Sequence, residues 1–119
     1  MDVLIVEPNI HRGWLWQRHI ERNGGYVTCV HSQQAAIEEL QDRCIDIIVL
    51  NLELESDSAL AIADYAGYRR PDVRIIFVTG STFFSDGSIF AMNANACAFL
   101  QAETPPEDLA AMVAHYGLN

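Results

Sequence analysis

The segment Ile45-Asp46-Ile47-Ile48-Val49-Leu50-Asn51-Leu52-Glu53-Leu54-Glu55-Ser56 decides the fold of this chain. Its first half is a short apolar, β-branched run and its second half is polar and acidic, which is typical of a buried strand that ends in a loop. In open parallel sheets, ligands and chemistry gather beyond the carboxyl ends of the strands. Asn51 is therefore a candidate functional residue, although its side chain is an amide.

Apolar runs of the same kind recur along the chain and alternate with helical patterns. Strands are expected at 2–6, 26–30, 45–50, 73–78 and 97–100. Helices are expected at about 10–23, after a cap at Ser32, between a polar loop at 51–57 and Arg69-Arg70-Pro71, within 85–95, and after the capping box Thr104-Pro105-Pro106-Glu107. Continuous apolar strands that alternate with helices indicate a parallel sheet covered on both faces.

The first helix is expected to bury one face, on which Leu15, Trp16, His19 and Ile20 fall at helical spacing. Trp14 and Trp16 are about 200° apart around the axis, so one of them should be exposed. We expect His19 to be a core histidine and not a ligand. Three later helices should each bury one face. The residues on these faces are Ala36, Ile37 and Leu40 in the second helix, Leu60, Ala63 and Ala66 in the third, and Leu109, Met112, Val113 and Tyr116 in the fifth.

Length and charge exclude several classes of protein. The 119 residues suffice for one domain, which we expect to span 1–119. The formal charge of −9, and the absence of any lysine from the sequence, argue against direct binding of nucleic acid, which needs a basic surface. No apolar run approaches the ~20 residues needed to cross a membrane, and no signal peptide is visible, so we expect a cytoplasmic protein.

The three cysteines, Cys29, Cys44 and Cys97, are widely spaced and form no CxxC pair. Each lies within or beside an apolar segment. Free cysteine behaves as a small hydrophobic residue, so we expect three buried, reduced thiols.

Six segments, taken in order and at their separations, resemble one known family. They are 3–7, 20–30, 35–41, 45–52, 71–80 and 98–102. The whole chain is similar to the receiver domain of two-component response regulators, exemplified by the chemotaxis protein CheY. The resemblance implies an α/β, flavodoxin-like (CheY-like) three-layer sandwich, with five parallel strands in the order 2-1-3-4-5 and five helices.

The resemblance also implies a particular chemistry. In the family, an Asp at the end of the third strand accepts a phosphoryl group from a histidine kinase, a step that needs a carboxylate nucleophile. A Mg²⁺ held by acids at the end of the first strand neutralises the phosphoryl oxygens. A Lys after the fifth strand and a Ser or Thr after the fourth bind the phosphoryl group.

This sequence departs from the family at those positions. Asn51 stands where the acceptor Asp is expected, Pro8 replaces the second acid of the first pair, and Ala102 replaces the Lys. Thr79 and the aromatic Phe99 are kept. We therefore predict a degenerate acceptor pocket with no catalytic residue, no metal and no cofactor. Its residues are Glu7, Pro8, Asn51, Glu53, Thr79 and Ala102.

Two alternatives remain at this pocket. Asp46 or Asp57 could act as a substitute acceptor, although neither is placed where the strand ends. Glu7 and Glu53 could together hold a weakly bound cation. Otherwise they are solvated acids, or one of them is hydrogen-bonded by Asn51 or Thr79, and the amide of Asn51 bridges the pocket without charge.

The expected function is signalling by phosphorylation-independent binding of proteins, and not enzymatic catalysis. Receiver domains usually bind partners through their fourth helix, fifth strand and fifth helix. That face would carry Phe90, Met92, Phe99, Pro105 and Tyr116, and Phe83-Phe84 add apolar surface nearby. The partner could be a histidine kinase, another regulator or a second copy of the chain, with no role for a membrane.

A small-ligand or enzyme function on the same fold is the remaining alternative. A flavin or nucleotide site would need a phosphate-binding loop after the first strand. The segment 7–13 lacks the necessary glycines and hydroxyls, and His11 beside Arg12 is a weak anion site.

Overall fold

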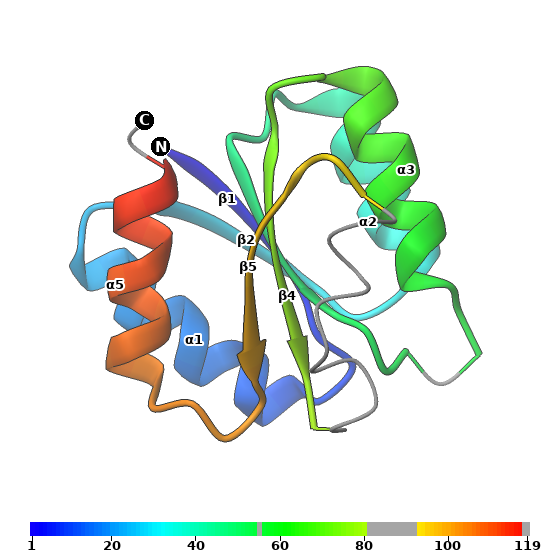
Figure 1. Ribbon diagram of the computed structural model, residues 1–119. Helices are drawn as coiled ribbons and strands as arrows, with labels where there is room; N and C mark the ends of the chain where they lie inside the picture. Colours follow the sequence, from blue (N-terminus) through cyan, green and yellow to red (C-terminus); the bar gives the residue numbers. More distant parts are fainter. Residues whose placement is uncertain (55, 81–92, 118–119) are drawn as a thin grey trace.

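The structure is a computed structural model that describes residues 1–54, 56–80 and 93–117 (Figure 1). In chain order its elements are β1 Asp2–Val6, α1 Ile10–Arg22, β2 Tyr26–Val30, α2 Gln33–Asp42, β3 Ile47–Asn51, α3 Ala59–Arg69, β4 Arg74–Thr79, β5 Ala96–Gln101 and α5 Pro106–Gly117. The described residues therefore contain four helices. The fourth expected helix, within 85–95, falls mainly on 81–92, which lie outside the described residues.

The five strands form one parallel sheet in the order β2-β1-β3-β4-β5, as predicted. Helices α1 and α5 cover one face of this sheet, and α2 and α3 cover the other (Figure 1). The architecture is the predicted three-layer sandwich of the flavodoxin-like, CheY-like class. Its parallel order brings the carboxyl ends of β1, β3, β4 and β5 to one edge of the sheet.

Alternate residues of each central strand enter two separate cores, because successive side chains of a strand point to opposite faces. On the α2/α3 side, Ile48, Leu50 and Phe77 are fully buried. On the α1/α5 side the strands pack against Trp16 and Ile20 of α1. Both faces of the sheet are apolar, which explains why the strands appear in the sequence as continuous apolar runs.

Polar side chains begin three of the helices. Asn9 accepts a hydrogen bond from the backbone N–H of Arg12, Ser32 from that of Ala35, and Ser58 from that of Ala61. These bonds satisfy backbone donors that have no partner within the helix. Gly24, in the turn after α1, has a φ of 92°, a backbone conformation that residues with a side chain rarely adopt.

The two tryptophans of α1 divide as expected. Trp16 is 2% exposed, whereas Trp14 is 47% exposed, with Arg18 placed 4.9 Å from the centre of its ring. His19 is half-buried, and its Nδ1 lies 2.9 Å from the carbonyl oxygen of Leu15, consistent with a satisfied structural histidine.

Some expected strand boundaries, and the expected burial of Cys44, were wrong: β4 is Arg74–Thr79 and β5 is Ala96–Gln101. Strand β3 runs from Ile47 to Asn51 and not from Ile45 to Leu50, because Asn51 still pairs with Val78 of β4. Cys44 is exposed, since it lies in the turn after α2 and not within a strand. In α3, Leu60, Ala63 and Ala66 all contact the core as expected, and Ala59 and Ile62 are buried beside them.

Candidate functional site at the carboxyl ends of the strands

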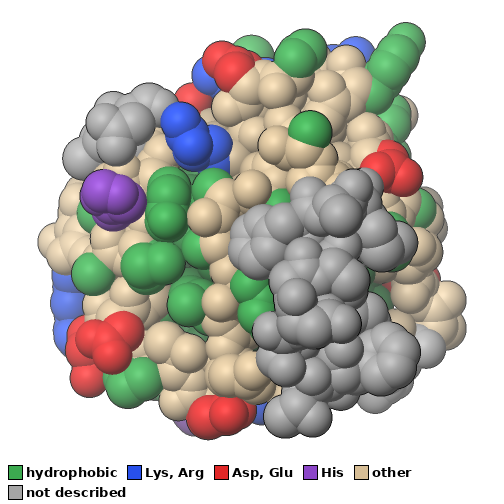
Figure 2. Space-filling model, in the orientation of Figure 1, with side chains coloured by type: hydrophobic (Ala, Val, Ile, Leu, Met, Phe, Trp, Pro, Cys, Tyr) green, Lys and Arg blue, Asp and Glu red, His purple; other side chains and the backbone are tan. Residues whose placement is uncertain are grey.

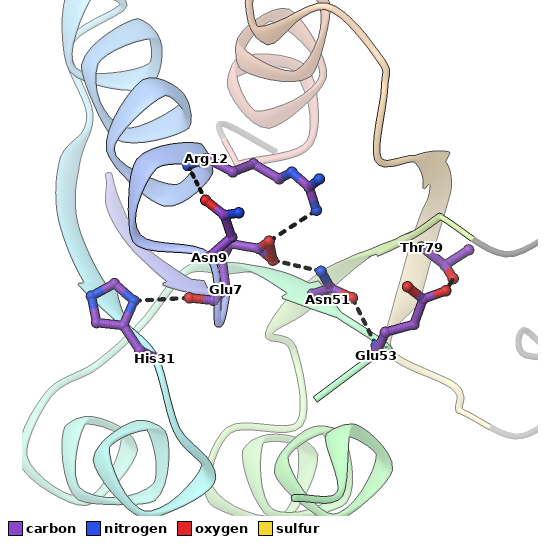
Figure 3. Close-up of polar contacts among 7 residues, drawn as sticks. All are labelled: Glu7, Asn9, Arg12, His31, Asn51, Glu53 and Thr79. Carbon is purple, nitrogen blue, oxygen red and sulfur yellow. Dashed lines mark hydrogen bonds and ion pairs between the residues drawn. The ribbon is translucent and has the colours of Figure 1, made fainter. Parts of the chain in front are cut away.

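The predicted pocket residues lie at the carboxyl edge of the sheet. Glu7 follows β1, Asn51 is the last residue of β3, Thr79 is the last residue of β4, and Ala102 follows β5. The backbone N–H of Ala102 donates to the carbonyl oxygen of Thr79 at 2.8 Å, which holds the ends of β4 and β5 together. Figure 3 shows the polar side chains of this edge turned toward one another.

Glu7 and Asn51 form the buried centre of the site. Glu7 is 0% exposed and Asn51 is 3% exposed. The amide Nδ2 of Asn51 donates to Oε2 of Glu7 at 2.5 Å, a bond that joins the ends of β1 and β3 (Figure 3). The other amide atom of Asn51, Oδ1, accepts from the backbone N–H of Glu53 at 2.7 Å. Both ends of the amide are therefore occupied.

Glu53 and Thr79 form a second pair at the same edge. The hydroxyl of Thr79 donates to Oε1 of Glu53 at 2.7 Å, and Thr79 is fully buried whereas Glu53 is exposed. Of the alternatives left open for the two acids, the hydrogen-bonded arrangement is the one observed: Asn51 bonds Glu7, and Thr79 bonds Glu53. Glu7 is not a solvated acid, because no part of it reaches the surface.

Arg12 and His31 also belong to the site, and sequence reasoning missed both roles. Nη1 of Arg12 lies 3.1 Å from Oε1 of Glu7. Nδ1 of His31 lies 2.8 Å from the carbonyl oxygen of Glu7. Arg12 had been considered only as part of a weak anion site; instead it pairs with a carboxylate of its own chain.

Burial sets the ionisation of Glu7. Loss of hydration raises the pKa of its carboxyl group above the ordinary value of 4.5, because water no longer stabilises the charge. The hydrogen bond from Asn51 and the charge of Arg12 oppose this shift without cancelling it. Glu7 is thus a carboxyl group whose charge depends on two neighbouring side chains.

The two substitute acceptors considered from sequence lie elsewhere. Asp46 precedes β3, at the opposite edge of the sheet, where it accepts from the backbone N–H of Asp2 and pairs with Arg70 at 3.1 Å. Asp57 accepts from the backbone N–H of Gln33 at 2.8 Å, at the start of α2. Each carboxylate already has a structural partner.

The Mg²⁺ that the family resemblance implies does not fit these residues. A hard divalent cation needs several oxygen ligands, with carboxylates foremost. No group of three or more His, Cys, Asp or Glu in the described part of the chain could hold a metal ion. Each oxygen of Glu7 already accepts a bond, one from Arg12 and one from Asn51.

The residues predicted for the protein-binding face are only partly brought together. Phe99 of β5 is half-buried against the core on the α2/α3 side, whereas Tyr116 of α5 packs on the α1/α5 side. Pro105 is exposed just before α5. Phe99 of the edge strand β5 and Tyr116 of α5 therefore contact opposite sides of the sheet. Figure 2 shows hydrophobic side chains gathered over this region. Phe90, Met92 and Phe83-Phe84 lie outside the described residues.

Within the described ranges no helix is both long and apolar enough to span a membrane.

Comparison with known proteins gives a structural match and no sequence match. No protein-family model matches the chain, and neither does any curated protein. Among solved structures, a CheY-like response regulator receiver domain from Methanospirillum hungatei JF-1 has a TM-score of 0.86 at 20% identity, over 98% of this chain and 92% of that one. A receiver domain from Clostridium thermocellum has a TM-score of 0.85 at 18% identity, over 98% and 94%.

A third similar solved structure carries a phosphorylated side chain. It is a response regulator from Burkholderia pseudomallei that contains a phosphorylated aspartic acid, a calcium ion and citrate. Its TM-score is 0.80 at 22% identity, over 96% of this chain and 71% of that one. At such identities the likeness establishes the fold: this chain has the fold of a response-regulator receiver domain.

Proposed function

We propose that this chain is a receiver-like signalling module of the two-component type that acts by binding other proteins and is not switched by phosphorylation. The observation that carries the proposal is the state of Asn51. It occupies the strand-end position at which the resemblance expects the acceptor Asp, and both ends of its amide are bonded within the chain. A neutral amide offers no carboxylate with which to form an acyl phosphate.

Two further observations support the same proposal. The chain contains no lysine, so the cationic clamp of the family is absent from every position, and Ala102 follows β5 where that Lys is expected. The carboxylates of Asp46 and Asp57 have other partners, so neither is a ready replacement for the acceptor.

Treatment with acetyl phosphate and Mg²⁺, followed by intact-mass measurement, tests the loss of phosphorylation. We expect no gain in mass from the natural chain. The matched comparison is the triple variant Pro8→Asp, Asn51→Asp, Ala102→Lys, which restores the nucleophile, an acidic ligand and the clamp; phosphate uptake by this variant alone would support a degenerate pocket. A stable adduct on the natural chain would instead make it a conventional receiver.

The proposed binding surface is the β5–α5 face, which we define by Phe99, Pro105 and Tyr116. Its partner is a histidine kinase, another regulator or a second copy of the chain. Pro105 is exposed, and Phe99 and Tyr116 are half-buried, so each keeps part of its surface accessible. Aromatic side chains suit such an interface.

Affinity capture from native lysate tests the face. We expect Tyr116→Ala and Phe99→Leu to lose a partner that the natural chain retains with and without acetyl phosphate. Tyr68→Ala is the matched control, because Tyr68 is 81% exposed on α3, away from this face. Equal retention by all three variants would contradict the assignment of the face, and thermal melting would confirm that each variant is folded.

A further inference from the structure

The carboxylate of Glu7 requires a positive partner. It is 0% exposed, and a buried carboxylate is costly unless it is paired and hydrogen-bonded. Asn51 supplies a hydrogen bond at 2.5 Å but no charge. The neighbouring elements bring Arg12 of α1 and Cys29 of β2 near the Glu7 side chain, and His31, beyond β2, contacts the backbone carbonyl oxygen of Glu7.

Arg12 is the member of this set that carries a permanent charge. Its Nη1 lies 3.1 Å from Oε1 of Glu7, on the carboxylate oxygen that Asn51 does not use. Figure 3 shows the Arg12 side chain extending from α1 across the strand end, so that Glu7 is held between a guanidinium group and an amide. Each carboxylate oxygen thus has its own nitrogen donor.

The backbone of α1 prepares Arg12 for this contact. Asn9 caps the helix by accepting from the N–H of Arg12 at 2.9 Å, so that one loop positions both the helix start and the guanidinium. Gly13, the next residue, lets α1 approach closely: a side chain there would meet Sγ of Cys29 at 2.7 Å and Cβ of Glu7 at 3.6 Å. Because the side chain of Arg12 is 40% exposed, its guanidinium keeps part of its hydration while it contacts Glu7.

We propose that Arg12 is the resident cation of the strand-end pocket: its guanidinium takes the charge-balancing role that Mg²⁺ has in receivers, and it makes the closed pocket independent of divalent cations. The electrostatic reason is direct. Glu7 and Arg12 together carry no net charge, and Asn51 adds none, so an arriving Mg²⁺ meets only the single charge of Glu53, whose Oε1 already accepts from Thr79. To bind Glu7 it would also have to displace the guanidinium.

Arg12 and Asn51 share the carboxylate of Glu7, so this proposal rests on the same pocket as the proposed function, and the contact that belongs to it alone is Arg12–Glu7. In the proposed function, Asn51 does not accept a phosphoryl group. In the present proposal, Arg12 stabilises the negative charge of Glu7. A chain that accepts phosphate would overturn the first and leave the second to its own test. Binding of Mg²⁺ by the natural chain would overturn the second alone.

A double-mutant cycle with Mg²⁺ titration tests the inference. The variants are Arg12→Gln, Glu7→Gln and the double variant, with Arg18→Gln as the control for loss of an arginine elsewhere on α1. We expect Arg12→Gln to lower the equilibrium constant for folding about tenfold in the natural background and several-fold less beside Glu7→Gln, because neighbouring groups couple. Arg12→Lys should recover part of the loss, since it keeps the charge.

The Mg²⁺ titration provides the second readout. We expect the melting temperature of the natural chain to change no more with MgCl₂ than with NaCl of equal ionic strength, because a ligand that binds only the native state must raise it. A Mg²⁺-specific rise would overturn the proposal. So would equal losses from Arg12→Gln with and without Glu7. If Arg12→Gln does not fold, Arg12→Lys with and without Glu7→Gln gives the coupling, and the Mg²⁺ titration of the natural chain gives the second readout.

Discussion

The amide Nδ2 of Asn51 donates to the carboxylate Oε2 of Glu7 at 2.5 Å, across the ends of the two adjacent strands β3 and β1. The two positions are those at which the family resemblance expects acidic side chains, a nucleophile and a metal ligand. An amide at one of them converts what would be repulsion between two carboxylates into a hydrogen bond. The pocket is therefore stable as a closed polar cluster.

Asn51→Asp should destabilise the chain near neutral pH. Two carboxylates at this distance cannot both be ionised without a strong mutual penalty, and one pKa must rise. We expect a loss of about 1–3 kcal/mol in the free energy of unfolding, measured by urea denaturation. The loss should shrink on acidification, because one protonated carboxyl can donate to the other. Asn51→Ala is the control: it removes the hydrogen bond that lowers the pKa of Glu7 but adds no charge, so its loss should shrink less on acidification than that of Asn51→Asp. An equal pH dependence in the two variants would contradict this explanation.

Glu7 should make the chain less stable as the pH rises above the acid range. Burial raises its native pKa above 4.5, so between that value and the raised pKa the native state binds more protons than the unfolded chain. Stability then falls with rising pH in this window: the favourable contribution is complete below the unfolded pKa and is lost through the native pKa. Glu7→Gln should flatten this slope in denaturant titrations at several pH values. A slope unchanged from the natural chain would assign the effect to another group.

The parallel sheet could be predicted from the sequence because both of its faces are covered by helices. Runs such as Ile47 to Leu50 are apolar at every position, which is typical of a strand buried on two sides. The position of Asn51 could be predicted for the same reason, since a polar residue directly after such a run must lie at the strand end. The exact boundary was less predictable, because pairing with Val78 extends β3 through the asparagine.

The partners of Glu7 could not be predicted in the same way. Arg12 reaches Glu7 only because the chain turns at Pro8 and Asn9 and α1 then returns toward the strand end. Spacing along the sequence gives the position of a backbone but not the direction of a long, flexible side chain. One available signal was overlooked: Gly13 inside a helix suggests close packing.

The three cysteines should differ in reactivity toward iodoacetamide. The thiolate is the reactive form. Burial, with a further contribution from the charge of Glu7, raises the pKa of Cys29 to about 11, and burial also raises the pKa of Cys97. Cys44 is exposed. We expect Cys44 to be alkylated first under native conditions, with peptide mass spectrometry as the measurement. In denaturant the three should react alike; unequal rates there would point to local sequence and not to burial.

Gly13→Ala should disturb the contact between α1 and the pocket. Alanine favours a helix over glycine by up to about 1 kcal/mol, so a surface site would gain stability. At this position the added Cβ would lie 2.7 Å from Sγ of Cys29, and the helix must shift away from β2 and Glu7. We therefore expect a net loss of stability by thermal melting. Cys29→Ala removes the obstructing sulfur, so the double variant should be more stable than the sum of the single effects predicts. Additive effects would mean that the helix already has room for a side chain, and that the close approach of α1 does not depend on glycine.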